Sequence, residues 1–586
     1  MLRVAVVGSG PSGCYTAQSL VQLDPEVRVD VLDRLPCPYG LVRYGVAPDH
    51  EKIKSLQNNL RSVLEHERVR FLGGVQIGPG GVPAERLREL YHAVVYCVGA
   101  ATDRHLGIPG EELPGSWSAT QFVSWYSAHP DAGEDGFVRD VRSAVVIGVG
   151  NVAVDVTRML ARGAAELSPT DMPQAALTAL AASRVSDIHM VGRRGPSQAR
   201  FTTKELRELN GLPGAEVTVD PAELTLDPAY TDPSALPAAQ RRNVEVLKTW
   251  ANATQTATKA GLGPVSGTGA GADAGTGAVA RAGAGAGTEA DGRSRLEPDA
   301  GARTAVGARA EAEAAGKAPT VAGAWAEADG GSRTATGTGA ETGDGPPMAT
   351  GARADTGDGP PMAADTRAQT GDGACADDGV RASAGAVGGV GPMGRGGRRS
   401  IALRFFLRPV ELLADGGRVG AVRFERTVPD WLGGVVGTGR FEEIEAQLVL
   451  RSVGYRGVQL EGLPFDAEGG TVPHLGGRVL REGVVAAGEY VAGWIKRGPT
   501  GVIGTNRPDA KETATSLLED APVLAARRLP GDPLAVLRAG GVEPVPWTGW
   551  QAIERAEAAL GASLGRSVVK LADWESLLAA ARTPAP

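Results

Sequence analysis

The sequence predicts an α/β fold made of two units of strand, glycine-rich turn and helix, with the second unit inserted into the first. The first unit has an apolar strand at 1–7, a Gly-x-Gly-x-x-Gly turn at 8–13 and a helix that continues to Leu23. The second unit repeats this plan with a strand at 143–147 and a Gly-x-Gly-x-x-Ala turn at 148–153. Both patterns are typical of Rossmann-like dinucleotide-binding domains, in which a parallel sheet lies between helices in a three-layer arrangement.

The first turn has the residues that a dinucleotide site needs. Gly8 permits the tight turn, Gly10 lets the backbone approach a pyrophosphate, and Gly13 lets the helix pack closely on the strand. The helix N-terminus, with roughly half a positive charge, faces the phosphates. Asp33 ends the next strand, twenty residues after the third glycine, where a carboxylate can bind ribose hydroxyls. A turn without a ligand is the alternative in a chain with 83 glycines, but the spacing favours a site.

The second unit differs at the corresponding strand end. Its strand at 187–191 is followed by Arg193 and Arg194 instead of an acid. A guanidinium group offers planar paired donors, which suit a 2′-phosphate better than a free 2′-hydroxyl. The pattern therefore predicts NADPH rather than NADH, with a solvated strand end as the alternative.

Length and composition limit the possible classes of protein. A chain of 586 residues predicts two or three domains. The net charge of −8 gives no reason to expect nucleic acid as a partner, and no apolar run is long enough to predict a membrane span. The N-terminus lacks a signal-peptide pattern. Cys14, Cys37, Cys97 and Cys375 lie far apart without a CxxC motif, which favours a reducing cytoplasm and excludes a local redox dithiol.

The rest of the chain predicts further strands and helices around these units. After an irregular loop at 39–50, a helix is expected at 53–64 with Asp49 as its cap. Further strands are expected at 69–72, 75–77, 93–98, 401–407, 418–425, 446–452 and 484–488, with helices at 201–209, 502–518 and 552–560. Trp547, Trp550 and Trp574 in the C-terminal region are expected to serve packing.

Residues 253–398 have a different composition, dominated by Gly, Ala, Thr, Asp and Arg. Thr-Gly-Asp-Gly recurs at 342, 356 and 370, which raises the alternative of a solenoid repeat. The copies lack an apolar set that could stack, and the segment cannot bury enough apolar surface to offset chain entropy. We therefore expect a disordered insertion.

Several longer motifs add a family resemblance. The segments at 8–13, 39–50, 108–115, 150–156, 191–196, 204–208 and 493–503 resemble adrenodoxin-reductase-type ferredoxin–NADP reductases, including bacterial members. The resemblance covers the chain except 253–398. It implies an FAD-binding domain formed by 1–106 and 456–586, and an NADP-binding domain at 107–455 that contains the insertion.

The resemblance also implies site residues. The implied FAD contacts are Gly8, Gly10, Ser12, Gly13, Asp33, Leu41, Ile77, Trp494, Gly501, Val502 and Ile503. The implied NADP contacts are Val149, Gly150, Asn151, Val152, Arg193, Arg194, Glu205 and Gly501. It places His50 near the flavin as the candidate catalytic residue, in a proton path. The residues alone equally permit a helix cap beside a structural imidazole, and no metal site is expected.

The implied reaction passes a hydride from NADPH to FAD and then single electrons to an acidic ferredoxin-type iron–sulfur protein. The expected docking face contains Arg200, Lys204, Arg207, Arg241, Arg242 and Lys248. A flavin disulfide reductase, a flavin monooxygenase and a non-catalytic scaffold remain as alternatives. The first would need a dithiol near the flavin, and the second lacks its own signature here.

Overall fold

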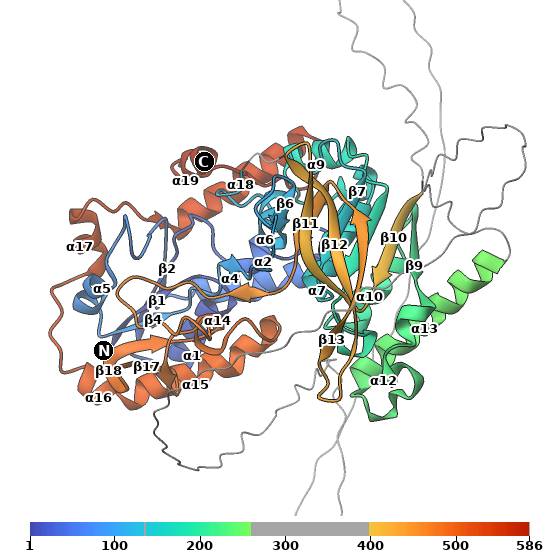
Figure 1. Ribbon diagram of the computed structural model, residues 1–586. Coiled ribbons are helices and arrows are strands. Elements are labelled where there is room, and N and C mark those ends of the chain that lie inside the picture. The colour runs from blue at the N-terminus through green and yellow to red at the C-terminus, as the bar shows by residue number, and fades with distance from the viewer. Residues whose placement is uncertain (134–135, 260–397, 585–586) are drawn as a thin grey trace, which may run out of the picture. The chain divides into compact units, whose positions relative to one another are not determined.

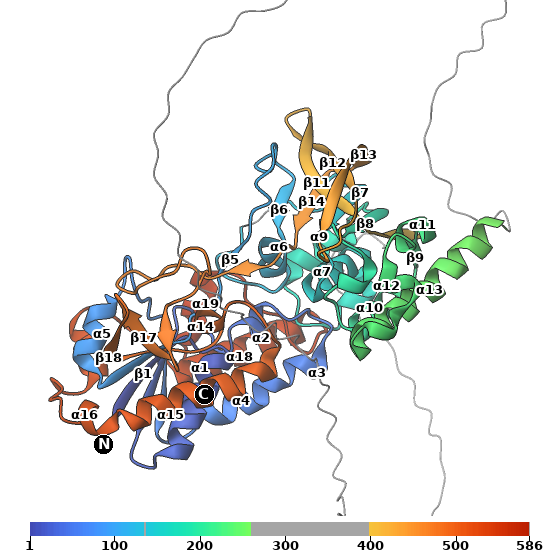
Figure 2. The same ribbon diagram turned by 60° about the horizontal axis from the view of Figure 1, so that its bottom comes forward.

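The computed structural model describes residues 1–133, 136–259 and 398–584, which are coloured in Figures 1 and 2. The predicted insertion lies outside these residues over 260–397. Two large sheets rich in parallel strands confirm the predicted α/β fold with two Rossmann-like units.

The first sheet has eight strands in the order β16-β17-β18-β4-β1-β2-β3-β19. Their bounds are β1 (Arg3–Val7), β2 (Arg28–Leu32), β3 (Val69–Gly73), β4 (Ala93–Tyr96), β16 (His474–Leu475), β17 (Arg478–Arg481), β18 (Val484–Val491) and β19 (Val545–Pro546). The strands from β18 to β3 pair in parallel, and β1 lies between β2 and β4 with Val4 opposite Val29 and Ala93. Antiparallel strands close both edges. The chain's two ends thus build one sheet.

Burial on both faces explains the apolar first strand. Val4, Ala5 and Val6 are fully buried, as expected for a central parallel strand covered by helices on both sides. Helix α1 (Pro11–Leu23) starts with proline in its first turn, where the missing N–H costs no hydrogen bond. It packs beside α15 (Asn506–Glu519), so the C-terminal part of the chain covers the first glycine turn's helix (Figure 2).

The second sheet has six parallel strands in the order β6-β14-β7-β8-β10-β9. Their bounds are β6 (Ser116–Ser118), β7 (Ser143–Ile147), β8 (Asp187–Val191), β9 (Ala215–Val219), β10 (Arg399–Arg404) and β14 (Leu448–Arg451). Helices α7 (Asn151–Ala161), α10 (Thr203–Asn210) and α13 (Ala238–Lys259) belong to this unit. Their apolar faces share one core with the strands, including Val156, Leu206 and Leu247.

Two smaller sheets complete the unit. An antiparallel ribbon, labelled in Figure 1, is formed by β11 (Leu407–Asp415), β12 (Arg418–Pro429) and β13 (Val435–Glu445). The pair β5 (Thr102–Asp103) and β15 (Tyr455–Arg456) joins the two segments that connect the large sheets. The strands of the eight-stranded sheet come from 3–96 and 474–546, and those of the six-stranded sheet come from 116–451. The domain boundaries expected from the sequence stay a prediction.

The remaining helices, apart from α18, are short. They are α2 (Leu41–Tyr44), α3 (Glu51–Lys54), α4 (Leu56–Leu64), α5 (Ala84–Leu90), α6 (Ala119–Tyr126), α8 (Ala164–Leu167), α9 (Gln174–Ala181), α11 (Pro221–Leu224), α12 (Pro228–Thr231), α14 (Trp494–Arg497), α16 (Ala521–Leu524), α17 (Pro533–Ala539), α18 (Trp547–Ser563) and α19 (Trp574–Ala581), with 3₁₀ turns η1 (Pro196–Gln198), η2 (Pro233–Ala235) and η3 (Ile503–Thr505). None of the helices within the described ranges has the length and apolar character to cross a membrane.

Several sequence-based boundaries are wrong. The insertion was expected to begin at 253, but α13 continues to Lys259, because this stretch has no glycine or proline to end it. The helix expected at 53–64 is broken at Ser55 into α3 and α4. The strand expected at 401–407 is split, because Phe406 takes a left-handed conformation with φ of 57°.

The fourth correction concerns the strand expected to be buried at 484–488. In β18 the first residues, Val484 and Val485, are exposed, and only Gly488–Val491 is buried. The exposed end pairs with β17 alone, whereas Glu489–Val491 also pairs with β4. An apolar run therefore marks this strand but not its buried half.

Candidate active site

The first glycine turn is built by close backbone contacts. Gly8 has a φ of 106°, and a Cβ atom on it would lie 2.5 Å from the Cys97 carbonyl oxygen. A Cβ on Gly13 would lie 1.8 Å from the Gly8 carbonyl oxygen, so helix α1 can approach β1 only with glycine there. Gly10 differs, since the nearest atom to its Cβ would be the Gly40 Cα at 3.8 Å. Packing does not require glycine at this position, whereas a ligand lying on the helix N-terminus would.

A buried hydroxyl beside this turn lacks a partner. The Oγ atom of Ser12 has no hydrogen-bond partner among the described residues. It lies against Gly493, where a Cβ would come within 2.5 Å of it. Leaving a buried hydroxyl unpaired costs about 1–3 kcal/mol, and a phosphate oxygen of a bound dinucleotide would satisfy it. Ser12 thus fits the predicted FAD contact.

Asp33 is held at the end of β2 by three donors. Its Oδ2 accepts from the Ser9 backbone N–H at 2.8 Å and from the Ser9 hydroxyl at 2.5 Å, and its Oδ1 accepts from Leu35 N–H at 2.9 Å. Burial raises the pKa of Asp33, although the hydrogen bonds from Ser9 and Leu35 favour its ionised form. A carboxylate has about four acceptor positions, so one remains for a ribose hydroxyl.

The segment after β18 forms an exposed edge. Trp494 lies 5.3 Å from the ring of Tyr455 and donates from Nε1 to the Thr500 carbonyl at 3.2 Å. Gly501 has a φ of 84°, and Val502 is half exposed. The helix expected from 502 begins as the 3₁₀ turn η3 and becomes α-helical only at Asn506.

The delayed start of α15 has a local cause. The Thr505 hydroxyl accepts from the Val502 backbone N–H at 3.1 Å, which holds Val502 extended in front of the turn. Gly501, Val502 and Ile503 therefore present backbone and apolar groups at a surface, as a flat ring system would require.

Two other predicted FAD contacts give weaker support for a flavin site. Leu41 is exposed at the start of α2, while Ile77 lies in an apolar core that already accounts for its side chain.

The second glycine turn is tied to the loop before α10. Asn151 accepts through Oδ1 from the Thr202 N–H at 2.8 Å, and the Val149 carbonyl accepts from the Arg200 N–H at 2.8 Å. Gly150 precedes α7, and a Cβ on it would meet nothing within 4 Å. As at Gly10, packing within the protein does not require glycine at this position. Val152, the remaining predicted contact, lies in the first turn of α7.

The arginine pair after β8 has a fixed backbone and free side chains. The Arg193 carbonyl accepts from the Thr427 hydroxyl at 3.0 Å, and the Arg194 carbonyl accepts from the Phe406 N–H at 3.3 Å. Arg193 is exposed and Arg194 half-buried. Within the described parts of the chain, neither guanidinium has a carboxylate at ion-pair distance. Both charges are therefore available for a phosphate.

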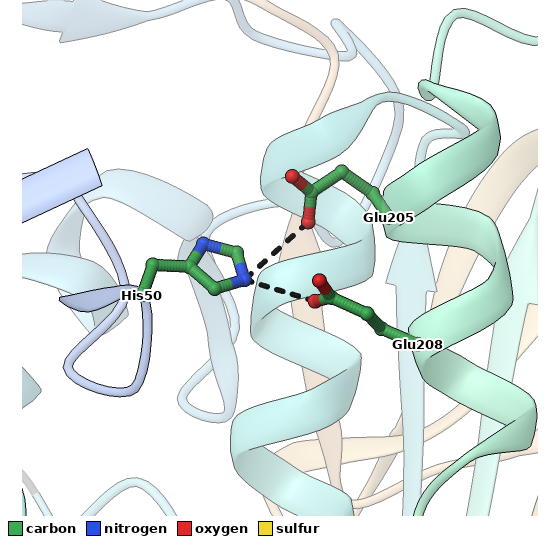
Figure 3. Close-up of side chains that lie close together, drawn as sticks. All are labelled: His50, Glu205 and Glu208. Atoms are coloured by element: carbon green, nitrogen blue, oxygen red, sulfur yellow. Dashed lines mark hydrogen bonds and ion pairs between the residues drawn. The ribbon is translucent and has the colours of Figure 1, made fainter. Parts of the chain in front are cut away.

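His50 lies between the two units (Figure 3). Its Nε2 atom is 2.9 Å from Glu208 Oε2 and 3.5 Å from Glu205 Oε2, both on α10. The guanidinium of Arg158, on α7, places Nη2 2.7 Å from the same ring nitrogen. One nitrogen cannot donate and accept at once, so the Glu208 contact requires a proton on Nε2 and the Arg158 contact requires its absence. The position of this proton thus selects the partner.

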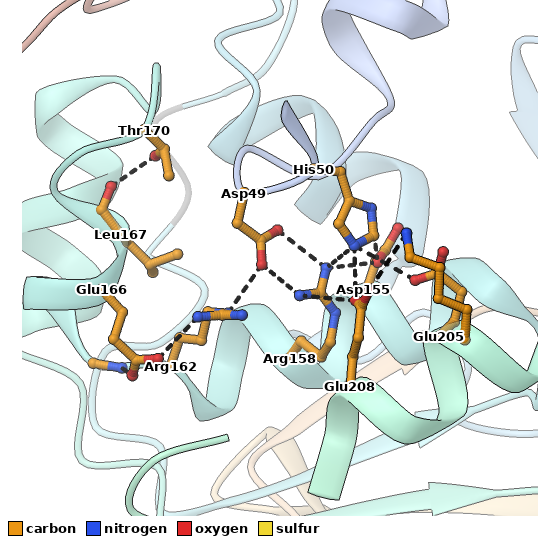
Figure 4. Close-up of polar contacts among 12 residues, drawn as sticks. Asp49, His50, Asp155, Arg158, Arg162, Glu166, Leu167, Thr170, Glu205 and Glu208 are labelled. Atoms are coloured by element: carbon orange, nitrogen blue, oxygen red, sulfur yellow. Dashed lines mark hydrogen bonds and ion pairs between the residues drawn. The ribbon is translucent and has the colours of Figure 1, made fainter. Parts of the chain in front are cut away.

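Asp49 belongs to the same group of charges (Figure 4). It accepts from both terminal nitrogens of the buried Arg158 and pairs with Arg162 at 3.0 Å. The sequence-based assignment of Asp49 as a helix cap is therefore wrong. Asp49 makes no capping hydrogen bond to α3, whose N-cap is His50. Arg158 on α7 and Arg162, which follows the end of that helix, outcompete a single backbone N–H for the carboxylate.

The two glutamates on α10 differ in acidity. Burial, with the nearby charge of Asp155, raises the pKa of Glu205. Burial acts in the same direction at Glu208, but the hydrogen bond with His50 and the charge of Arg158 outweigh it and lower the pKa. Glu208 is therefore the stronger acid of the two neighbouring carboxyls.

The imidazole and two carboxylates lie close enough to hold a cation. The Arg158 guanidinium, however, already supplies a positive charge against the same ring nitrogen. It would repel a metal ion there, so we read the cluster as an ion-pair network.

Sequence reasoning placed His50 and Glu205 in the site but missed Arg158 and Glu208. A signal was available, because Asp155 and Arg158 are charged positions three residues apart among the apolar residues of α7. Such a pair inside a helix that must be buried indicates partners from elsewhere in the fold.

The cysteines in the described residues are poorly suited to dithiol chemistry. Cys14, Cys37 and Cys97 are buried free thiols. Burial raises the pKa of Cys37 to about 11 and that of Cys97 to about 12, and it raises the pKa of Cys14 further. A reactive thiol needs a lowered pKa, because the thiolate is the nucleophile.

Comparison with known proteins gives a consistent result. A family model described as pyridine nucleotide-disulphide oxidoreductase matches residues 2–195. The NADPH-ferredoxin reductase FprA of Mycobacterium tuberculosis is 35% identical over 98% of this chain and 98% of its own. The mitochondrial NADPH:adrenodoxin oxidoreductase of Arabidopsis thaliana is 31% identical over 99% and 95%. A solved structure of Mycobacterium tuberculosis FprA in complex with NADPH has a TM-score of 0.71 at 33% identity, covering 99% of this chain and all of that one. These matches confirm the resemblance of the motifs, and the chain belongs to the family of NADPH–ferredoxin and NADPH:adrenodoxin reductases.

Proposed function

We propose that this chain is an FAD-dependent ferredoxin–NADP reductase that takes electrons from NADPH and passes them to a ferredoxin-type iron–sulfur protein. The observation that carries this proposal is the difference between two equivalent strand ends. Asp33 offers a carboxylate after β2, whereas Arg193 and Arg194 after β8 offer two guanidinium groups that no carboxylate of the described residues pairs with. One unit therefore suits the adenosine of FAD, and the other suits the 2′-phosphate of NADPH.

The first unit would hold FAD. The N-terminus of α1 with Gly8, Gly10 and Gly13 faces the pyrophosphate, Ser12 donates its hydroxyl, and Asp33 accepts from the ribose. The edge at Trp494 and 501–503 would contact the flavin ring. When bound, FAD supplies the chemistry that connects a two-electron hydride donor with a one-electron acceptor. The protein supplies position and electrostatics.

The second unit would hold NADPH. Backbone groups of Val149 to Val152 contact its pyrophosphate at the N-terminus of α7. Arg193 and Arg194 bind the 2′-phosphate, and Gly501 lets the nicotinamide approach the flavin edge without a side chain in between. The carboxyl group of Glu205 is buried and faces His50, and its pKa is raised. The predicted contact of Glu205 with NADP would be made by this same carboxyl group.

His50 would hold a proton near the reacting rings. The loop that carries it starts at the first glycine turn, where Tyr39 N–H donates to Ser9 O at 3.1 Å, and ends against α7 and α10. It thus touches both units. Removing the imidazole should slow hydride transfer without changing NADPH selectivity, since the arginine pair lies elsewhere.

The partner would be an acidic ferredoxin that docks on a basic face of α10 and α13. Arg200, Arg207 and Arg242 are exposed, and Lys248 lies over the ring of Tyr230. Lys204 is exposed but pairs with Glu208 at 3.6 Å, which links it to His50. A charge test should therefore spare Lys204.

The double change Arg207→Glu and Arg242→Glu should raise the KM for ferredoxin by about tenfold or more at low ionic strength, and less at high salt. Reduction of ferricyanide, which needs no docking face, should stay unchanged. Arg538→Glu on α17 is a matched control, because it reverses one exposed charge in the other unit. If the double variant has the same ferredoxin KM as Arg538→Glu, this face is not the docking site.

The alternative activities predict different measurements. A disulfide reductase would need a reactive thiol pair, which the buried Cys14, Cys37 and Cys97 do not provide. A monooxygenase would couple oxygen consumption to an organic substrate. A scaffold would consume no NADPH. We retain the cytoplasm as the expected compartment, because three buried free thiols suit a reducing environment.

The first experiment is the absorption spectrum of the purified protein. Bands of oxidised flavin should appear and should be bleached by NADPH much faster than by NADH. Ferredoxin-coupled reduction of cytochrome c then tests the acceptor. A colourless protein that cannot be reconstituted with FAD would refute the proposal.

A further inference from the structure

The hairpin between β12 and β13 exposes two large apolar side chains at its tip. Trp431 is 90% exposed and Leu432 is 74% exposed. Single exposed apolar residues are common on proteins, but a tryptophan and a leucine side by side on an ordered turn indicate a contact surface.

Hydrogen bonds fix the backbone of this tip. The Asp430 carboxylate accepts from the N–H groups of Leu432 at 2.8 Å and Gly434 at 2.6 Å. The Asp430 N–H donates to the Gly434 carbonyl at 3.2 Å, which closes the turn. Trp431 is therefore carried on a preformed loop, and a ligand that contacts it does not have to order the backbone first.

The tip runs alongside the segment that carries the arginine pair. At one end, the Thr427 hydroxyl donates to the Arg193 carbonyl at 3.0 Å. At the other, the Gln198 side chain donates from Nε2 to the Gly433 carbonyl at 2.7 Å. Residues 427–433 and 193–198 are thus joined at both ends, and Trp431 lies on the stretch between the two bonds.

The two segments offer complementary groups for one ligand. Arg193 and Arg194 present positive charge without acidic partners in the described chain, and Trp431 presents a large aromatic face. An adenosine with a 2′-phosphate needs both, because its base stacks on aromatic rings and its phosphate binds guanidinium groups. Asp430, the charged residue of the turn itself, is acidic and would not attract an acidic protein.

We propose that Trp431 stacks on the adenine of NADPH while Arg193 and Arg194 hold its 2′-phosphate. This assignment rests on the proposed function, since it adds a residue to the NADPH site. It makes the hairpin tip a determinant of coenzyme affinity rather than of ferredoxin binding.

Calorimetric titration with 2′,5′-ADP tests the assignment, because this probe contains the adenine and the 2′-phosphate but no nicotinamide. Trp431→Ala should raise the Kd by about tenfold, the scale expected for loss of a base–aromatic stack. Trp431→Phe keeps an aromatic face and should stay within about threefold of the wild type. Phe441→Ala is the matched control. Phe441 is an exposed aromatic of the same hairpin, paired with Glu425 on the far side of Thr427 from the tip.

Fluorescence provides a second readout. 2′,5′-ADP should quench part of the tryptophan emission of the wild type, and this quenching should be absent in Trp431→Phe. Equal Kd values for the wild type and Trp431→Ala would overturn the assignment, and so would a raised ferredoxin KM with unchanged 2′,5′-ADP binding. A wild type that does not bind 2′,5′-ADP would instead overturn the NADPH site itself and this assignment with it.

Discussion

At the scale of residues, we propose that coenzyme selectivity depends on the side chains at the end of an apolar strand. Asp33 and the pair Arg193–Arg194 occupy equivalent places after β2 and β8, and both are positioned by backbone hydrogen bonds. The carboxylate keeps a free acceptor position, and the guanidinium groups have no carboxylate at ion-pair distance in the described parts of the chain. The same scaffold would therefore accept a ribose in one unit and a phosphorylated ribose in the other.

Replacing both arginines tests this selectivity. Arg193→Ala with Arg194→Ala should weaken NADPH binding by about 10- to 100-fold, the scale of lost charged hydrogen bonds. The rate of flavin bleaching by NADH should change little, because NADH has no 2′-phosphate. Stopped-flow absorbance with both coenzymes measures the ratio. If selectivity for NADPH survives the double change, another residue must read the phosphate.

The glycines of the first turn should separate folding from binding. Gly10→Ala places a Cβ where the protein leaves room, so unfolding of the FAD-free protein should change by less than about 1 kcal/mol. The same methyl group would lie between α1 and the pyrophosphate and should lower FAD content. Gly13→Ala would put its Cβ 1.8 Å from the Gly8 carbonyl oxygen and should prevent folding. Full FAD occupancy in Gly10→Ala would contradict this reading.

Residue-level prediction from sequence could name candidate site residues where the spacing is local, and their roles in binding stay predictions. The glycine turns, Asp33 and the arginine pair each follow a strand by a few residues, so one pattern locates them. The partners of His50 could not be located in this way. Glu208 and Arg158 are more than one hundred residues away and meet the imidazole only through folding. Asp49 was misassigned for the same reason, because a cap is a local interaction and the contact with Arg158 is not.

At the scale of elements, the loop at 39–50 links the two units. One end contacts the first glycine turn, and the other places Asp49 and His50 against α7 and α10. Burial opposes ionisation of Asp49, but the hydrogen bonds and charge of Arg158 and the charge of Arg162 outweigh it and lower the pKa. The ionised carboxylate is therefore stabilised by folding.

This shift gives a pH dependence with a defined sign. A carboxyl whose pKa is lowered in the folded state contributes stability above its unfolded pKa, near 3.9, and loses it as pH falls through the folded value. Asp49→Asn should cost about 2–3 kcal/mol at pH 7, and the difference from the wild type should shrink below about pH 4. Urea unfolding from pH 3 to 7 measures it. Glu543→Gln, at a highly exposed pair with Arg538, should change stability by less than about 1 kcal/mol at pH 7.

Element boundaries were predicted less well than element types. Apolar runs located β1, β4 and β7, because central strands are buried on both faces. The start of α15 was misplaced, since the Thr505 side chain holds Val502 extended before the helix begins. The start of the insertion was misplaced because the composition changes at 253, before α13 ends at Lys259.

At the scale of the whole molecule, every predicted cofactor contact lies outside the residues from 260 to 397. The flanking elements also have their own anchors. Trp250 of α13 lies in the core, and the Arg399 side chain at the start of β10 donates to the carbonyls of Ala161 and Arg162, both at 2.7 Å. All strands of the two large sheets that the structure describes come from outside 260–397.

Replacing 260–397 by a flexible Gly/Ser linker of about 30 residues, which spans roughly 30 Å, should therefore preserve both cofactor sites. FAD content should equal that of the full chain, and ferricyanide reduction by NADPH should stay within about twofold, because the free energy of closing a loop changes only slowly with its length. Ferredoxin-coupled reduction of cytochrome c is measured beside it. A change in that rate alone would assign the insertion to partner access, whereas loss of flavin would show that the insertion supports the NADP or FAD unit directly.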